Sequence, residues 1–148
     1  MADRVGVMSG GRLEQIAAPA ELYARPATAF VAEFVGTMNR IPGELRDSDR
    51  VAVLGTAVPV SGGTADGLSG GVDVLVRPES LRVELVANGN GIVTDRTFLG
   101  SLTRISVRLS GDVLVKVDRA STDSADMVPG ASVSVTLPEA PVLVTARA

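Results

Sequence analysis

The groups in this 148-residue sequence whose spacing could suit chemistry are carboxylates, arginines and the backbone amides of glycine-rich turns. The chain contains no His and no Cys. Their absence removes disulfides, thiol nucleophiles, Cys/His zinc sites and every Ser–His or Cys–His pair. Hydrolysis by paired carboxylates and a metal held by oxygen ligands remain open.

The carboxylates follow no catalytic or metal-binding motif. Asp and Glu total 17, but they never occur in the order of a Ca²⁺-binding loop with its bidentate Glu. We therefore interpret them as solvated loop residues, and the sequence predicts neither a catalytic residue nor a metal site.

Two glycine-rich segments could bind an anion through their backbone amides. Residues 9–11 (Ser-Gly-Gly) would do so only if the glycines opened a helix, whose free N–H groups and dipole favour phosphate. The flanking residues Val5, Val7, Leu13 and Ile16 are typical of strands, so the segment is predicted to be a hairpin turn. Residues 88–91 (Asn-Gly-Asn-Gly) are interpreted as a plain turn in the same way.

Charge and aromatic content exclude nucleic acid as a partner. The net charge is −3, Lys116 is the only Lys, and the Arg residues are scattered. Beyond residue 36 the only aromatic is Phe98, whereas single-strand binding needs stacked rings in a basic groove. No apolar run approaches the ~18 residues of a membrane span, and no signal peptide opens the chain, which favours the cytoplasm.

Residues 1–36 are predicted to form a β-hairpin followed by short helices. Pro19 is suited to the first position of a helix, and Pro26 stops or restarts that helix. In residues 27–35 the apolar side chains of Phe30, Val31, Phe34 and Val35 recur on one helical face. Gly36 is placed as the C-terminal cap.

The remainder is predicted to be a mainly β domain with an OB-like antiparallel barrel. Candidate strands are residues 50–54, 72–77, 82–86, 91–98, 102–109, 113–118, 132–137 and 142–145. Several of them alternate apolar and polar residues with period 2, and residues 109–113 suit a hairpin connection. Residues 61–71 and 120–126 are predicted to be polar loops. The residues expected inside the barrel are Val74, Val76, Ile105, Val107, Val115 and Val135.

The first 43 residues resemble the end of the ATPase domain of ABC importers. Two segments, residues 1–8 and 11–16, look like the last two strands of that domain. The family's P-x-E-[IL]-Y-x-x-P segment is matched by PAELYARP at residues 19–26. Its F-V-A-x-F-[IL]-G segment is matched by FVAEFVG at residues 30–36. Residues 38–43 look like the linker that follows. These blocks occur in the family's order and spacing.

The rest resembles the regulatory TOBE domain of the same subfamily, which serves maltose-, polyamine-, phosphonate-, iron- and sulfate-type importers. VRPESLRV at 76–83 is similar to that domain's V-R-P-E-x-[IL]-x-[LV] block, and residues 91–109 resemble its long strand pair. Residues 44–71 match no block. The resemblance implies an ATPase remnant in residues 1–36 and a TOBE-like domain in residues 37–148.

This resemblance implies a regulatory and dimerisation domain that couples ATP hydrolysis to solute uptake in a longer subunit. The phosphate loop, catalytic Glu and switch His are missing, so we expect a truncated chain that is not an enzyme and holds no cofactor, with MgATP bound by the parent protein. The implied partners are a second copy, two membrane-spanning permease subunits and an extracytoplasmic solute-binding protein. The implied location is the cytoplasmic face of the membrane.

The alternative is a stand-alone barrel that binds a small oxyanion, as molybdate-type barrels of related sequence do. Candidate ligand or interface residues are Arg77, Arg82 and Arg104, provided that they converge. A separate candidate is an exposed association face at Phe30 and Phe34, which would pack on the ATPase core in the parent. The transported solute and any regulatory ligand are not encoded in this sequence.

Overall fold

The N-terminal segment, residues 3–36, is a β-hairpin covered by two short helices. The structure is a computed structural model that describes residues 3–47, 49–61 and 64–147. Strands β1 (Val5–Ser9) and β2 (Arg12–Ala17) pair antiparallel. Gly10 and Gly11 connect them with positive φ angles of 57° and 79°, which suit glycine in a tight hairpin turn. The turn predicted at residues 9–11 is confirmed.

The two helices are short and bury a small apolar cluster against the hairpin. Helix α1 (Pro19–Ala24) starts at its proline, and α2 (Ala29–Phe34) is capped by Thr28, whose Oγ1 accepts a 3.2 Å hydrogen bond from the Val31 amide. The buried cluster comprises Val7, Ala17, Leu22 and Val31. In the described part of the chain, neither these helices nor any other is long and apolar enough to cross a bilayer.

Two five-stranded antiparallel sheets follow, and they confirm the mainly β, OB-like class. The first sheet has the order β12-β6-β3-β4-β5. Its strands are β3 (Asn39–Leu45), β4 (Arg50–Val53), β5 (Thr56–Pro59), β6 (Gly71–Val76) and β12 (Leu143–Ala146). A parallel bridge between Val60 and Val142 brings its two edges together. We call this group the first barrel.

The second sheet has the order β10-β9-β8-β11-β7. Its strands are β7 (Arg82–Leu85), β8 (Gly91–Leu99), β9 (Leu102–Leu109), β10 (Val113–Ala120) and β11 (Ser132–Thr136). Its edge strands β10 and β7 also meet, where the Arg119 guanidinium donates a hydrogen bond to the Val83 carbonyl oxygen. We call this group the second barrel.

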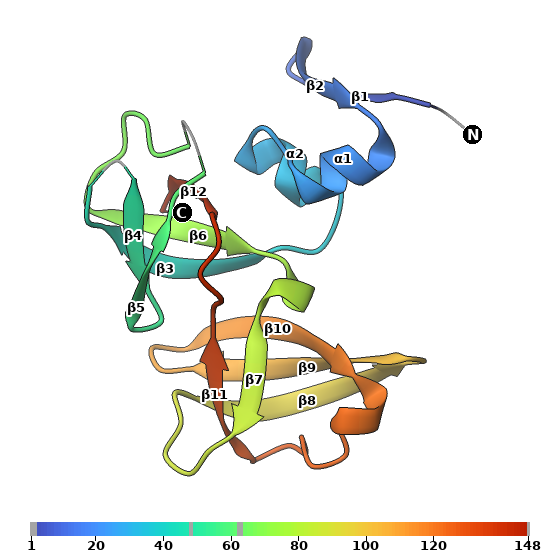
Figure 1. Cartoon of the computed structure of the whole chain (residues 1–148), viewed down its shortest axis with the longest axis vertical. Helices are drawn as coiled ribbons and strands as arrows, with labels where there is room; N and C mark the ends of the chain where they lie inside the picture. The colour runs from blue at the N-terminus through green and yellow to red at the C-terminus, as the bar shows by residue number, and fades with distance from the viewer. Residues whose placement is uncertain (1–2, 48, 62–63, 148) are drawn as a thin grey trace.

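The chain enters the second barrel from the first and then returns. A 3₁₀ turn, η1 (Pro78–Ser80), follows β6 and leads into β7, and the segment after β11 runs back to β12. Figure 1 shows the second barrel at the lower end and the N-terminal segment above the first barrel. A further 3₁₀ turn, η2 (Ser121–Asp123), follows β10.

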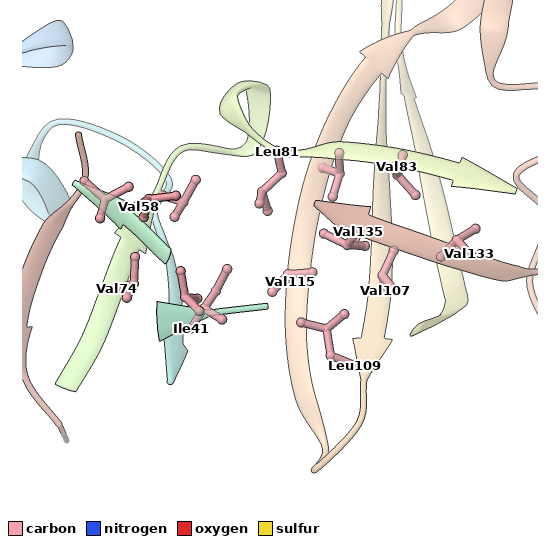
Figure 2. Close-up of a cluster of buried hydrophobic side chains, with 14 of the residues drawn as sticks. Ile41, Val58, Val74, Leu81, Val83, Val107, Leu109, Val115, Val133 and Val135 are labelled. Carbon is pink, nitrogen blue, oxygen red and sulfur yellow. The ribbon is translucent and has the colours of Figure 1, made fainter. Parts of the chain in front are cut away.

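One apolar core runs through both barrels. All six residues predicted to be inside are buried, with at most 4% of their surface exposed. Figure 2 shows Leu81 and Val115 where the side chains of the two barrels meet. Burying a Val side chain contributes about 1.5–3 kcal/mol, so this continuous core dominates the stability of the barrels.

The structure corrects several features of the sequence-based prediction. Residues 38–43, predicted to be a linker, belong largely to β3, and β5 lies in a segment where no second strand was predicted. The strands form two sheets instead of a single barrel. Residues 62–63 of the predicted loop lie outside the described residues. Ala65 of the same loop is buried at 6% exposure and belongs to the core.

Helix α2 buries aliphatic side chains and leaves its two aromatic rings at the surface. Val31 and Ala32 are fully buried, whereas Phe30 and Phe34 are 40% and 66% exposed. The cluster beneath the helix also contains Val7, Ala17 and Leu22. The two rings stack on each other at the surface, with centroids 5.9 Å apart.

Candidate functional site

Arg77 occupies the point where the N-terminal segment meets both barrels. It follows β6 directly and is only 8% exposed. Its guanidinium donates to the carbonyl oxygens of Thr37 (3.1 Å) and Tyr23 (3.3 Å), and it lies 4.2 Å from the centre of the Tyr23 ring. Such a cation–π contact contributes about 0.5–2 kcal/mol. Arg77 thus ties α1 to the end of β6.

Gly36 allows this close packing. A Cβ atom at Gly36 would lie 3.1 Å from Cε1 of Tyr23 and 3.3 Å from Nη1 of Arg77. Both distances are shorter than ordinary van der Waals contact, so a larger residue would push the ring and the guanidinium apart. The C-terminal cap of α2 is Val35, not Gly36 as predicted, and Gly36 serves the junction between the segment and the barrels.

Tyr23 and Glu79 form a second contact across the same junction. The Tyr23 hydroxyl donates a hydrogen bond to the Glu79 carboxylate in η1. Partial burial, followed by this hydrogen bond, raises the pKa of Tyr23. The ring thus lies between the Arg77 guanidinium on its face and the Glu79 carboxylate at its hydroxyl.

Arg104 lies near this group but is already paired. Its Nε and Nη2 donate to the two carboxylate oxygens of Asp118 at 2.8 and 3.0 Å, between directly opposed positions of β9 and β10. The hydrogen bonds to Asp118 are the main cause of a raised pKa for Arg104, and the nearby charge of Glu79 contributes as well. This bidentate pair neutralises Arg104 as a ligand for a further anion.

A cleft opens beside Arg77. It has a volume of about 600 Å³ and is lined by the end of α1, by the turn that connects the barrels and by the return segment before β12. Of the three predicted arginines, Arg77 and Arg82 line this cleft and Arg104 does not. The structure therefore brings two of the three together, and their role in ligand binding stays a prediction.

The sequence analysis missed Asn39, which joins the two barrels. Its side-chain amide makes two hydrogen bonds with the backbone of Lys116 in β10, each 2.8 Å long. Asn39 is buried at 6% exposure. No sequence signal marks this residue, because its neighbours were interpreted as a linker and its partner lies 77 positions away.

The other glycine-rich turn uses its polar groups within the protein. The Gly89 amide donates to Oγ of Ser132, and the Asn90 side chain makes two hydrogen bonds with the backbone of Val135. Within residues 3–47, 49–61 and 64–147, no group of three or more acidic residues is arranged to hold a metal ion.

The fold and the sequence together identify a TOBE-domain protein. The family model described as "TOBE domain" matches residues 74–144, from β6 through the second barrel to β12. Among solved structures, the cytoplasmic molybdate-binding protein ModG matches with a TM-score of 0.58, covering 74% of this chain and 96% of that one. At 16% identity this likeness shows the fold alone.

Curated relatives extend the match into the N-terminal segment. "Sulfate/thiosulfate import ATP-binding protein CysA 2" of Chromobacterium violaceum is 35% identical over 95% of this chain. "Spermidine/putrescine import ATP-binding protein PotA" of Rubrobacter xylanophilus is 37% identical over 91%, and "Fe(3+) ions import ATP-binding protein FbpC 2" of Rhodococcus jostii is 33% identical over 90%.

The chain belongs to the family of ABC importer ATP-binding subunits and corresponds to the end of their ATPase domain and their TOBE region. It spans 40% of the length of the Chromobacterium relative, 38% of the Rubrobacter relative and 39% of the Rhodococcus relative.

Proposed function

We propose that this chain is the regulatory and dimerisation part of the ATP-binding subunit of a bacterial importer, where it couples ATP hydrolysis to solute uptake. The observation that carries the proposal is the junction at Arg77. Arg77, Tyr23 and Glu79 connect α1 of the ATPase-like segment to the turn where the two barrels meet. A displacement of α1 must therefore break these contacts or move the barrels with it.

The partners of this subunit are a second copy, two permease subunits and an extracytoplasmic solute-binding protein, and its place is the cytoplasmic face of the membrane. MgATP is bound by the rest of the subunit, because this sequence has no phosphate loop. By itself the chain should neither bind nor hydrolyse MgATP. Micromolar binding in a calorimetric titration would contradict the assignment of residues 1–36 as the end of an ATPase domain.

The coupling role is tested in an importer whose ATP-binding subunit carries this sequence. Arg77→Ala should leave nucleotide affinity unchanged and should change the ratio of ATP hydrolysed to solute transported, measured in proteoliposomes. Arg108→Ala is the matched control, because Arg108 is an exposed arginine of β9 away from the junction. An unchanged ratio in Arg77→Ala, in a subunit that folds and assembles, would exclude this junction from coupling.

A second candidate function is the binding of a small oxyanion where two copies of the barrels meet. Two observations favour it: the fold resembles that of a molybdate-binding protein, and Arg77 and Arg82 line one cleft. A calorimetric titration with molybdate tests this function. Binding that depends on Arg82 and on dimer formation would support it, and an absence of heat at millimolar molybdate would rule it out.

A further inference from the structure

The cleft beside Arg77 is bounded by three segments that are distant in the sequence. Residues 23–26 end helix α1, residues 75–82 connect the two barrels, and residues 137–143 lead back to β12. Its volume of about 600 Å³ lies within the ~300–1,000 Å³ typical of small-molecule sites. A ligand in this cleft would contact the N-terminal segment and both ends of the connection between the barrels.

The charge of the lining is positive. Arg25 and Arg82 are exposed, and their guanidinium groups make no hydrogen bond or ion pair with the described residues. The single carboxylate in the lining belongs to Glu79, which already accepts a hydrogen bond from Tyr23. Two unpaired arginines at one cleft favour a ligand with a carboxylate, phosphate or sulfonate group.

A third arginine of the lining has an unused donor. Nε of Arg77 is buried and has no hydrogen-bond partner in the described part of the chain, although the side chain is only 8% exposed. Buried N–H groups are nearly always paired, so this donor is an exception among the groups around the cleft. Because the atom is closed off from the cleft surface, the charged group of a ligand would meet the exposed Arg25 and Arg82 instead.

Apart from Ser61 and Ser80, the rest of the lining is largely apolar. Met38, Leu75, Leu137, Pro141 and Val142 contribute side chains without charge. A hydrated inorganic ion would leave this surface uncovered, whereas an organic anion would bury part of its body against it. The lining therefore suits a ligand with one charged end and one apolar end.

We propose that this cleft binds a small organic anion, with its charged group at Arg25 and Arg82 and its apolar body against Met38, Leu137 and Pro141. The site is complete within one chain, so it requires neither the second copy nor the rest of an ATP-binding subunit. It goes beyond both functions proposed above and depends on neither. Because it includes α1 and the connection between the barrels, an occupied cleft would hold the N-terminal segment in the arrangement seen here.

The probe for the test is phenyl phosphate, titrated into the ¹⁵N-labelled chain and followed by amide chemical shifts. We expect saturable shifts at the amides of the non-proline residues in 23–25, 77–82 and 137–143. Inorganic phosphate and benzyl alcohol, which each carry half of the probe's chemistry, should bind at least about tenfold more weakly. The double variant Arg25→Glu/Arg82→Glu should weaken phenyl phosphate binding by at least about tenfold, and Arg108→Glu should change it less than about twofold.

Arg25 and Arg82 are exposed, so the double variant should keep the amide dispersion of the buried core strands. The first three of four results that would overturn the proposal concern phenyl phosphate itself. They are an absence of saturation by about 10 mM phenyl phosphate, shifts that lie outside the cleft, and equal weakening by the double variant and Arg108→Glu. Binding of inorganic phosphate as tight as that of phenyl phosphate would also overturn it, because the apolar wall would then have no role.

Discussion

The N-terminal segment and the double barrel are stabilised in different ways. The segment buries a cluster of four hydrophobic residues, whereas the core cluster of the two barrels contains twenty-one. Large apolar side chains of the segment stay exposed, among them Met8 at 57%, Leu13 at 56% and Phe34 at 66%. Each apolar side chain left in water forgoes about 1.5–3 kcal/mol.

The comparison shows that the segment depends on its neighbours more than the barrels do. Several of its links to the barrels are polar: Tyr23 to Glu79, Arg77 to the Tyr23 carbonyl, and Arg40 of β3 to Glu33 of α2 at 3.1 Å. Exposed ion pairs contribute about 0–1 kcal/mol. Substitutions in the barrels should therefore lower stability only where they reach the core. Substitutions in the segment should have effects at its exposed surface and at its junction with the barrels.

The largest expected effect is that of Val107→Asp in β9. Val107 is fully buried and lies opposite both Val93 and Val115. An unpaired carboxylate at this position should cost about 4 kcal/mol or more and unfold the barrels. Leu114→Asp is the control, since Leu114 is 65% exposed and should change the free energy of unfolding by no more than about 0.5 kcal/mol. A native melting temperature for Val107→Asp would show that our assignment of the β9 faces is wrong.

The second effect concerns association through the exposed rings of the segment. We expect the chain to self-associate through the segment, through the barrels or through both. If Phe30 and Phe34 are buried in that contact, Phe30→Ser/Phe34→Ser should lower the association constant by at least about tenfold in sedimentation equilibrium.

Phe98→Ser is the matched control for this association, because Phe98 is 73% exposed but lies on the second barrel. An unchanged association constant in the double variant would assign the contact to the barrels. A monodisperse monomer of the unmodified chain at tens of micromolar would exclude self-association by either route.

A smaller effect is expected from removing the link between the barrels. Asn39→Ala should cost about 1–3 kcal/mol, because the backbone N–H and C=O of Lys116 lose their partners. The slope of the free energy of unfolding against urea concentration should also fall, because the two barrels begin to unfold separately. Asn90→Ala removes a similar pair of bonds within the second barrel and should lower stability without that change in slope. Equal urea slopes in the two variants would show that Asn39 does not link the unfolding of the two barrels.

The smallest effect is a pH dependence at the junction. The pKa of Tyr23 is raised in the folded protein, so the folded state holds the hydroxyl proton more tightly than the unfolded state does. The stability that this hydroxyl contributes is fully present below the unfolded-state pKa of about 10, and it is lost as the pH rises through the folded-state pKa. Thermal unfolding between about pH 8 and 11 should therefore show a loss of stability that Tyr23→Phe abolishes.

Tyr23 is the only tyrosine in the chain, so its ionisation can be followed directly by ultraviolet absorbance. An ordinary pKa in this titration would mean that the hydroxyl is not held by Glu79 in solution. Hydrogen exchange in α1 provides an independent measure, since Tyr23→Phe should speed exchange there and leave β9 unaffected.

The amino-acid sequence by itself predicted the local elements whose signals lie close together. Period-2 alternation located β9 and β10 and placed Val107 and Val115 inside, because neighbouring side chains of a strand point to opposite faces. The glycines at positions 10 and 11 identified the first hairpin. The order of short motifs identified the family, since such motifs need no knowledge of distant contacts.

Only the tertiary structure decided the features that depend on distant partners. Strand β3 contains Pro42 and Gly43, which weaken any strand pattern, yet Gly43 is required because a Cβ there would lie 2.9 Å from Val74 and 3.0 Å from the Ala52 carbonyl oxygen. The division into two barrels follows from the return of β12 to pair with β6, which no local pattern records.

The junction was decided in the same way. The sequence marked Arg77, Arg82 and Arg104 as similar cations, but packing gave each a different environment. Arg77 is hydrogen-bonded to carbonyl oxygens and lies against Tyr23, whereas Arg82 is exposed at the cleft. Arg104 forms a bidentate pair with Asp118. Tyr23 and Glu79 are 56 residues apart. Side-chain type sets what an arginine can bind, but the fold decides which acceptors reach it, because hydrogen bonds and ion pairs act only over a few ångströms.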